Sequence, residues 1–118
     1  MASIGSWIPG VAINPILNAF IVQSPAVANG GNTGTFYSLV FCITNKSLAA
    51  ADFLVGVWDA ASVVVTTTTI TVQASSSFIY NAGGPVAIPN GYTVRVQTVV
   101  ALTGTISAAI SMALESNY

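Results

Sequence analysis

Residues 83–115 read GGPVAIPNGYTVRVQTVVALTGTISAAISMALE, and this stretch decides the fold. From Gly104 onward it alternates between apolar residues and small or polar ones, which is the period of a β-strand with one buried face. Residues 92–100 alternate in the same way. The stretch therefore predicts two strands. Their expected buried positions are Tyr92, Val94, Val96 and Val100 in the first, and Ile106, Ala108, Ile110, Met112 and Leu114 in the second.

Turn residues flank these two strands. Pro89-Asn90-Gly91 precedes the first strand and predicts a turn, because proline presets one turn angle and Asn-Gly tolerates positive φ. Thr103-Gly104 lies between the strands and predicts a second turn, so we expect them to form an antiparallel pair. A membrane-spanning helix over 95–115 is the competing interpretation, since no charged residue lies between the two ends of this segment. Polar residues interrupt it repeatedly and its period is two, which favours strands.

Shorter strand-like segments occur along the rest of the chain, at 16–22, 36–44, 53–58, 63–72 and 78–80. The run VVVTTTTITV at 63–72 is the clearest, because β-branched residues suit a pleated sheet. Turn signals separate the segments, and none of them predicts a long helix. The sequence therefore predicts an all-β fold, an antiparallel two-sheet β-sandwich or jelly roll. Exposed alone, 63–72 would be prone to aggregation, so we expect its edge to be covered.

The domain organisation is simple, since 118 residues fit a single domain. Residues 1–15 contain two glycines and two prolines, which interrupt regular structure, and they predict an irregular N-terminal arm before a β-sandwich domain at 16–118. Trp7, Ile8 and Ile13 make this arm apolar and are the candidate interface residues. Two interpretations stay open: the arm folds over its own domain, or it reaches a neighbouring subunit.

The composition is unusual in its lack of charge. Hydrophobic residues make up 53% of the chain, charged residues only 4%, and the formal net charge is -1. Typical domains are about a quarter charged. A monomer with so few charges is poorly protected from self-association, which indicates that much of its surface meets other protein. Lys46 and Arg95 are the two basic residues, too few to predict nucleic-acid binding.

Catalytic chemistry is not predicted. The chain has no histidine, so a serine or cysteine nucleophile lacks its usual base, and one cysteine, Cys42, excludes an intrachain disulfide and a cysteine-based metal cluster. Asp52 and Asp59 bracket one predicted strand and lie roughly 20 Å apart, too far for an acid–base pair. We therefore predict no enzyme, no catalytic residues, no cofactor and no metal. Arg95, in mid-strand, is expected to pair with Glu115 or with a neighbour's acid.

Targeting and modification signals are weak. The start, MASIGSWIPG, has no basic region followed by an apolar run, so it does not predict a secretory signal. We expect the protein to be made in a cytoplasm and exported, if at all, inside something larger. Asn45-Lys46-Ser47 matches the glycosylation acceptor pattern, but the pattern is common by chance and predicts no site without a secretory signal.

Two segments of the C-terminal half form a recognisable combination. Residues 78–86 read FIYNAGGPV, residues 88–96 read IPNGYTVRV, and a closing alternating strand follows. This order of an aromatic strand, a glycine-rich step, apolar-Pro-Asn-Gly and Thr-apolar-Arg-apolar resembles small virion proteins of tailed bacteriophages. The resemblance implies a β-sandwich or jelly-roll domain without catalytic residues. Many such proteins decorate, or cement, the capsid and often form trimers, and others belong to the neck, tail or fibres.

The resemblance and the composition point to one expected function. We expect a capsid decoration subunit that binds and stabilises the shell, with Trp7, Ile8 and Ile13 as anchors. Its expected partners are further copies in a homotrimer and the major capsid protein or other virion subunits, without nucleic acid or membrane. Its expected location is the virion, assembled in the host cytoplasm.

Three alternatives stay open. The protein is a tail, neck or fibre component, a carbohydrate-binding β-sandwich module, or a membrane-inserted or fibre-forming peptide. A carbohydrate-binding module needs exposed aromatic residues beside polar side chains. The candidates before the C-terminus are Tyr37, Tyr80 and Tyr92.

Overall fold

The computed structural model describes residues 7–28 and 35–116. Within these ranges the chain forms nine β-strands. They are β1 (Trp7–Ile13), β2 (Phe20–Gln23), β3 (Phe36–Asn45), β4 (Ala51–Trp58), β5 (Val64–Val72), β6 (Ser76–Asn81), β7 (Val86–Ala87), β8 (Thr93–Thr98) and β9 (Thr105–Ser116). Over the same ranges, no helix has the length and apolar character needed to cross a membrane.

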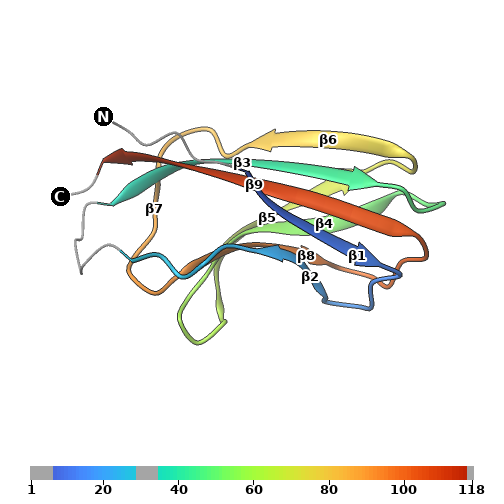
Figure 1. Ribbon diagram of the computed structural model, residues 1–118, viewed down its shortest axis with the longest axis horizontal. Coiled ribbons are helices and arrows are strands. Elements are labelled where there is room, and N and C mark those ends of the chain that lie inside the picture. The colour runs from blue at the N-terminus through green and yellow to red at the C-terminus, as the bar shows by residue number, and fades with distance from the viewer. Residues whose placement is uncertain (1–6, 29–34, 117–118) are drawn as a thin grey trace.

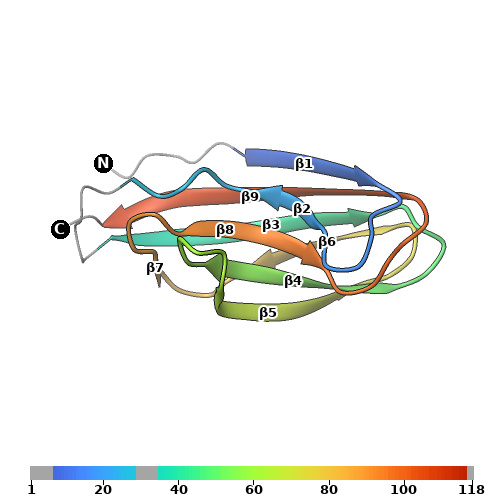
Figure 2. The same cartoon turned by 90° about the horizontal axis from the view of Figure 1, so that it is seen from below.

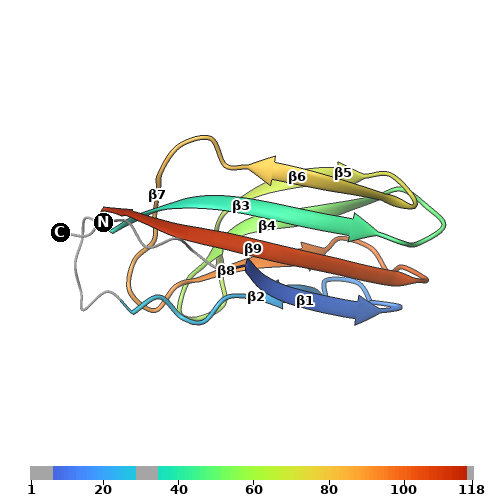
Figure 3. The ribbon, with the colours of Figure 1, turned by 45° about the horizontal axis from the view of Figure 1, so that its top comes forward.

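Two antiparallel sheets face each other (Figure 1). Sheet A has the strand order β1-β9-β3-β6, with β7 also paired to β3, and sheet B has the order β2-β8-β4-β5. Figure 3 shows β6 over β5 at one side of the sandwich and β1 over β2 at the other. Among the described strands, only β4 and β5 are consecutive partners within one sheet. This winding of the chain between two sheets is a jelly roll and confirms the predicted fold class.

The inner faces of the two sheets form the core. In β9 the even-numbered residues up to Ile110 are buried, and in β8 Val94 and Val96 are fully buried, as the alternation predicts. Phe41 of β3 and Phe53 of β4 fill the centre from opposite sheets. Each such side chain contributes about 1.5–3 kcal/mol when it leaves water, so the core stabilises the two-sheet arrangement.

β8 and β9 do not form the predicted antiparallel pair. β8 lies in sheet B between β2 and β4, whereas β9 lies in sheet A between β1 and β3. The chain does bend at Thr103-Gly104, where Gly104 has a φ of 128°, but it crosses from one sheet to the other between the two strands. A period of two shows which face of a strand is buried, but it does not show which strands pair with it. The membrane-helix interpretation of 95–115 is also wrong, since this segment contains strands of both sheets.

The N-terminal segment is more regular than predicted. Residues 7–13 are a strand of sheet A, β1, which pairs with β9 from Trp7 opposite Ser111 to Ile13 opposite Thr105. Pro9 is tolerated there because β1 is an edge strand. On the side of β1 that has no neighbouring strand, a missing N–H donor removes no hydrogen bond between strands. The part of the predicted arm before Trp7 lies outside the described residues.

β2 is shorter than the strand predicted at 16–22. Asn14 and Asn18 have positive φ values of 51° and 58°, a conformation that asparagine adopts more readily than most residues. The N–H of Asn14 donates to the carbonyl of Gly104, and the Asn14 side-chain oxygen accepts from the N–H of Gly104, both at 2.8 Å. The β1–β2 connection is therefore tied to the β8–β9 connection, and the regular strand begins only at Phe20.

The other predicted strands are found close to their expected bounds, as β3, β4, β5 and β6. The Asn90-Gly91 turn is also confirmed, since Gly91 has a φ of 86° and the N–H of Tyr92 donates to the carbonyl of Pro89. The glycines and asparagines of residues 28–35 predict a loop, and most of this segment lies outside the described residues.

Candidate interaction surfaces

The acidic side chains lie apart and each is hydrogen-bonded locally. The Asp52 carboxylate accepts from the Thr71 hydroxyl, Asp59 accepts from two backbone N–H groups of the loop that follows it, and Glu115 accepts from the Ser38 hydroxyl. In the described part of the chain, no three of His, Cys, Asp and Glu are grouped so that they could hold a metal ion. The absence of enzymatic activity stays a prediction.

Arg95 is held on the outer side of sheet B although its side chain is only 4% exposed. Its Nε donates to the Thr93 hydroxyl at 2.8 Å, and its Nη2 donates to the Ser62 hydroxyl at 2.9 Å. The guanidinium carbon lies 4.5 Å from the centre of the Phe20 ring and 5.7 Å from that of the Trp58 ring. Two aromatic rings and two hydroxyls therefore surround the charge.

This environment corrects the predicted pairing of Arg95 with Glu115. The two residues belong to different sheets, and Glu115 bonds to Ser38 instead. Burial lowers the pKa of Arg95 below its ordinary value, because desolvation penalises the charged form. Attraction to the electron-rich ring faces offsets part of that penalty.

The guanidinium of Arg95 gives a test that separates charge from geometry. Replacing Arg95 by lysine is expected to lower the free energy of unfolding by about 2 kcal/mol, because lysine keeps a buried charge but cannot bond two hydroxyls in a fixed fork. Replacing Arg95 by methionine removes the charge and keeps the apolar stem, so its cost is expected to be smaller, about 1 kcal/mol or less. Urea unfolding followed by tryptophan fluorescence measures both, and a larger cost for methionine would contradict this description.

The outer side of sheet A carries most of the exposed apolar residues that sequence analysis assigned to binding. We define the outer face of sheet A by side chains that share this side through their strand pairings. They are Trp7, Pro9, Val11, Ile13, Val40, Cys42, Thr44, Ile79, Ser107, Ala109 and Ser111. Small side chains in the middle leave a shallow depression of about 250 Å³ between β1, β9 and β3. None of these defining residues is charged, whereas Glu115, on the same side near the end of β9, carries a charge and accepts from the Ser38 hydroxyl.

The three predicted interface residues are divided between two sides of β1. Trp7 and Ile13 are 50% and 72% exposed on the outer face of sheet A, whereas Ile8 points inward and packs against the core. Val11 and Ile79, at 63% and 65% exposure, belong to the same outer face and were not predicted. Alternation along β1 places Val11 on the same face as Trp7 and Ile13, and this pattern could have identified it. Ile79 joins the face only through the pairing of β3 with β6, which the sequence pattern does not show.

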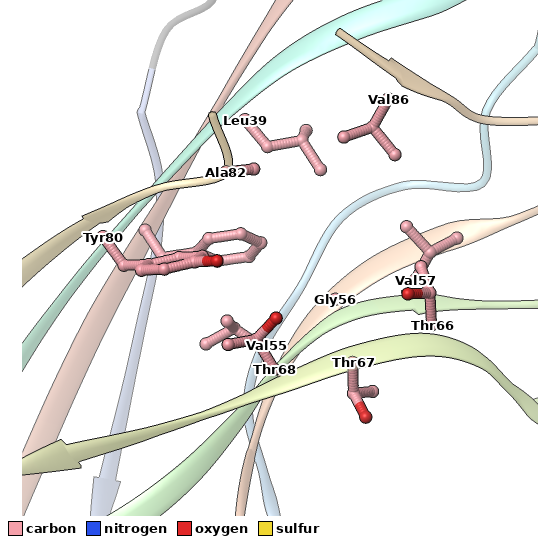
Figure 4. Close-up of a pocket in the computed structure, with 11 residues that line it drawn as sticks. Leu39, Val55, Gly56, Val57, Thr66, Thr67, Thr68, Tyr80, Ala82 and Val86 are labelled. Carbon is pink, nitrogen blue, oxygen red and sulfur yellow. The ribbon is translucent and has the colours of Figure 1, made fainter. Parts of the chain in front are cut away.

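A second feature, the side cleft, opens between the two sheets beside β5 (Figure 4). Its volume is about 170 Å³. Leu39, Tyr80, Ala82 and Val86 lie on one side of the space in Figure 4, and β4 and β5 form the other. The cleft thus has an apolar lining with hydroxyl groups at its margin.

The threonine run of β5 explains why the core is not filled here. Thr66 and Thr68 lie opposite the buried Val57 and Val55 of β4, so they face the inside of the sandwich. Further along the same side of the strand, Ile70 is buried as a core residue. Threonine in place of valine or isoleucine keeps the strand geometry but leaves polar atoms that favour contact with water or another polar group.

Comparisons with known proteins show the fold and no closer relationship. No profile of a protein family matches the chain, and no curated protein matches its sequence. Among solved structures, a chain from the structure of Triatoma virus matches with a TM-score of 0.54 and 8% identity over 98% of this chain. A chain of the Kashmir bee virus empty particle at acidic pH matches with a TM-score of 0.51 and 10% identity over 98% of this chain.

A similar fold also occurs outside viruses. An arabinose-bound α-L-arabinofuranosidase matches with a TM-score of 0.51 and 13% identity over 95% of this chain. The present chain spans 64% of the Triatoma virus chain, 90% of the Kashmir bee virus chain and 24% of the arabinofuranosidase chain. The jelly roll is therefore shared with proteins of virus particles. The structures named here include no tailed-bacteriophage decoration protein, so that likeness stays a prediction.

Proposed function

We propose that the protein is a structural subunit of a virion that acts by burying apolar surface against other protein subunits. The observation that carries this proposal is the outer face of sheet A. Trp7, Val11, Ile13 and Ile79 are each at least half exposed on it, and its defining residues carry no charge. Scattered exposed apolar residues are normal, but a contiguous group of this kind marks a contact with protein or membrane.

The jelly-roll fold supports a protein contact in a virion. Viral capsid subunits use this fold, and the likeness to chains of two virus particles agrees with that role. Within the virion, we propose that the subunit decorates the capsid and binds the major capsid protein through the outer face of sheet A. Its location is then the virion, assembled in the host cytoplasm. The homotrimer and the alternative tail, neck or fibre position stay predictions from the resemblance.

The carbohydrate-binding alternative has less support from the surface. Tyr37, Tyr80 and Tyr92 are partly buried and pack against the core, and Tyr80 also lines the side cleft. A sugar platform needs aromatic faces that are open to solvent. The shared fold with an arabinofuranosidase chain does not supply such a platform, so the virion role is the better-supported function.

Binding to capsid shells tests the role of the outer face directly. The double substitution Trp7→Ser and Ile13→Ser is expected to weaken binding to shells, assembled from the major capsid protein of the same genome, by at least tenfold. The physical reason is that two large apolar side chains lose their contact area, at about 25 cal/mol per Å². Co-sedimentation at a series of protein concentrations measures the effect.

A matched control uses exposed apolar residues that lie away from this face. The double substitution Leu48→Ser and Val100→Ser removes side chains that are 93% and 47% exposed and is expected to leave shell binding unchanged. Circular dichroism checks that both variants keep their strands. Equal loss of binding in the two variants, or no loss in either, would refute the assignment of the outer face.

A further inference from the structure

β5 is the least protected edge strand of the sandwich. In the described part of the chain it pairs only with β4, and Figure 2 shows it along one margin of the molecule, opposite β1. The other edge strands carry features that discourage pairing. These are Pro9 within β1 and the four-residue length and irregular register of β2, while β6 is shorter than β5, with six residues. β5 has nine residues without proline, glycine or charge.

An edge strand with these properties is a template for a further strand. Natural sheets protect their edges with charges, prolines, bulges or short strands, because unpaired N–H and C=O groups attract another chain. β5 has one irregularity, where its pairing with β4 shifts between Val64 and Thr66, and the following residues up to Val72 pair regularly. The apolar residues Val63, Val64 and Val65 at its start are about half exposed or more.

We propose that β5 pairs antiparallel with β5 of a second copy of this chain, about a two-fold axis at Thr68. Thr68 is the central residue of Val64–Val72, so this register runs along the length of the strand, with regular pairing from Thr66 to Ile70 inside the irregularity at Val65. It also places inward-facing residues opposite each other, as an antiparallel pair about such an axis requires. Thr68 meets Thr68 of the second copy and Thr66 meets Ile70. Val64 lies beyond the irregularity at Val65 and is opposite Trp58, on the outer side of sheet B, so it is not part of the inward-facing set.

The side cleft supports a second copy as the occupant of this edge. Thr66 and Thr68 line the cleft and are exposed in the single chain. A strand added beside β5 lies across the mouth of the side cleft. The side clefts of the two copies then face each other, and the pairing shields both from water. Threonine pairs across neighbouring antiparallel strands are favourable, because their methyl groups pack and their hydroxyls hydrogen-bond.

The charges also permit self-association at this edge. Asp52 is bonded to Thr71 near one end of the strand, and Asp59 accepts from the N–H of Val63 just before the other end. An antiparallel arrangement about Thr68 keeps the two Asp52 side chains at opposite ends of the paired strands. Each end then holds Asp52 of one copy and Asp59 of the other, and both carboxylates already accept hydrogen bonds within their own chain. The pairing concerns copies in solution and does not depend on a role in a virion.

The solution mass of matched variants tests the pairing. Thr68→Lys places two ammonium groups opposite each other at the proposed axis, and we expect the dissociation constant of the dimer to rise at least tenfold in sedimentation equilibrium of the full chain. Gln23→Lys adds the same charge to β2, the opposite edge strand of the same sheet, and is expected to leave the dimer unchanged. A wild-type monomer, a trimer insensitive to Thr68→Lys, or equal effects of both variants would overturn the proposal.

Cross-linking tests the register independently of charge. With Cys42→Ser as background, Thr68→Cys is expected to form a disulfide-linked dimer under mild oxidation, because directly opposed Cα atoms lie about 4.5–5.5 Å apart. Thr67→Cys is expected to stay unlinked, because in this register the two Cα atoms at that position are about 8 Å apart. Preferential cross-linking at 67, or none at either position, would contradict the two-fold axis at Thr68.

Discussion

Replacement of Asn45 by alanine is expected to lower the free energy of unfolding by about 3 kcal/mol. Asn45 is completely buried at the end of β3, and all of its side-chain hydrogen-bonding atoms are used. Its Nδ2 donates to the carbonyls of Ala49 and Val72 at 3.0 and 3.1 Å, and its Oδ1 accepts from the backbone N–H of Ser47 at 2.9 Å. The side chain therefore joins the end of β3, the following loop and the end of β5.

The cost follows from the groups that alanine would leave without a partner. The Ala49 carbonyl keeps the Ser47 hydroxyl as a donor, but the Val72 carbonyl and the Ser47 N–H lose the bonds that Asn45 supplied. Each buried group without a partner costs about 1–3 kcal/mol. Urea unfolding measures the loss.

A second asparagine gives the control for Asn45. Asn81 is exposed, and its Oδ1 accepts from the N–H of Gly83 at 3.0 Å. Water replaces that bond readily, so Asn81→Ala is expected to change the free energy of unfolding by less than about 1 kcal/mol. Similar effects of the two substitutions would show that Asn45 does not hold the three segments together.

Replacement of Gly10 by alanine is expected to be the most disruptive change at the N-terminal strand, with a loss of about 3 kcal/mol. A Cβ atom at Gly10 would overlap the Ile21 carbonyl oxygen and lie 2.7 Å from Val22 Cβ and 2.9 Å from Val22 Cα. Backbone atoms of β2 cannot move away as a flexible side chain does, so β1 must shift. Overpacking of this kind typically costs about 1–3 kcal/mol, and here we expect the upper end.

Hydrogen exchange shows where the damage from Gly10→Ala falls. Amide protection is expected to decrease most in β1 and β2, because these strands close one side of the sandwich, while the β4–β5 hairpin keeps its protection. Gly84→Ala is the matched control, since a Cβ there meets no heavy atom within 4 Å, and its effect is expected to be below about 0.5 kcal/mol. Loss of protection spread evenly over all strands would contradict the local origin of the effect.

Alternation predicted the strands and their buried faces but not their partners. The predicted core side of 104–115 is buried in β9 up to Ile110, because a buried face fixes the side-chain period. In 92–100, Val94 and Val96 are buried as predicted, whereas Val100 is 47% exposed beyond the end of β8. Thr93 and Arg95 on the other side of β8 are buried as well. The two strands lie in different sheets, and nothing in their own residues distinguishes pairing within a sheet from packing across the core. The jelly roll thus follows from the sequence as a class, and its strand order required the structure.

Local breaker residues were misleading where tertiary context compensated for them. Pro9 and Gly10 predicted an irregular arm, yet an edge strand tolerates the proline, and close contact with β2 requires the glycine. Asn45 matched a glycosylation pattern, but it is fully buried and bonded to Ser47 of the same tripeptide. Such roles depend on contacts between distant segments, so the pattern of neighbouring residues could not predict them.

The candidate surface was predicted in part for the same reason. Trp7 and Ile13 were predicted as interface residues of an apolar arm, and the structure places both on the outer face of sheet A, while their role in an interface stays a prediction. Ile8 faces the core because successive side chains of a strand point to opposite faces, and Ile8 directly follows Trp7 in β1. Ile79 joins this face only through pairing across β3, a contact between segments far apart in the chain.

The central claim is that the uncharged surface of this jelly roll is a contact between protein subunits. Light scattering of the purified full chain over a range of concentrations tests it most directly, since one chain has a mass of 12.0 kDa. We predict a defined assembly of two or more chains that persists on dilution to the micromolar range. A single species of 12.0 kDa at every concentration, together with no co-sedimentation of the chain with capsid shells, would contradict the claim, because water alone would then cover the surface.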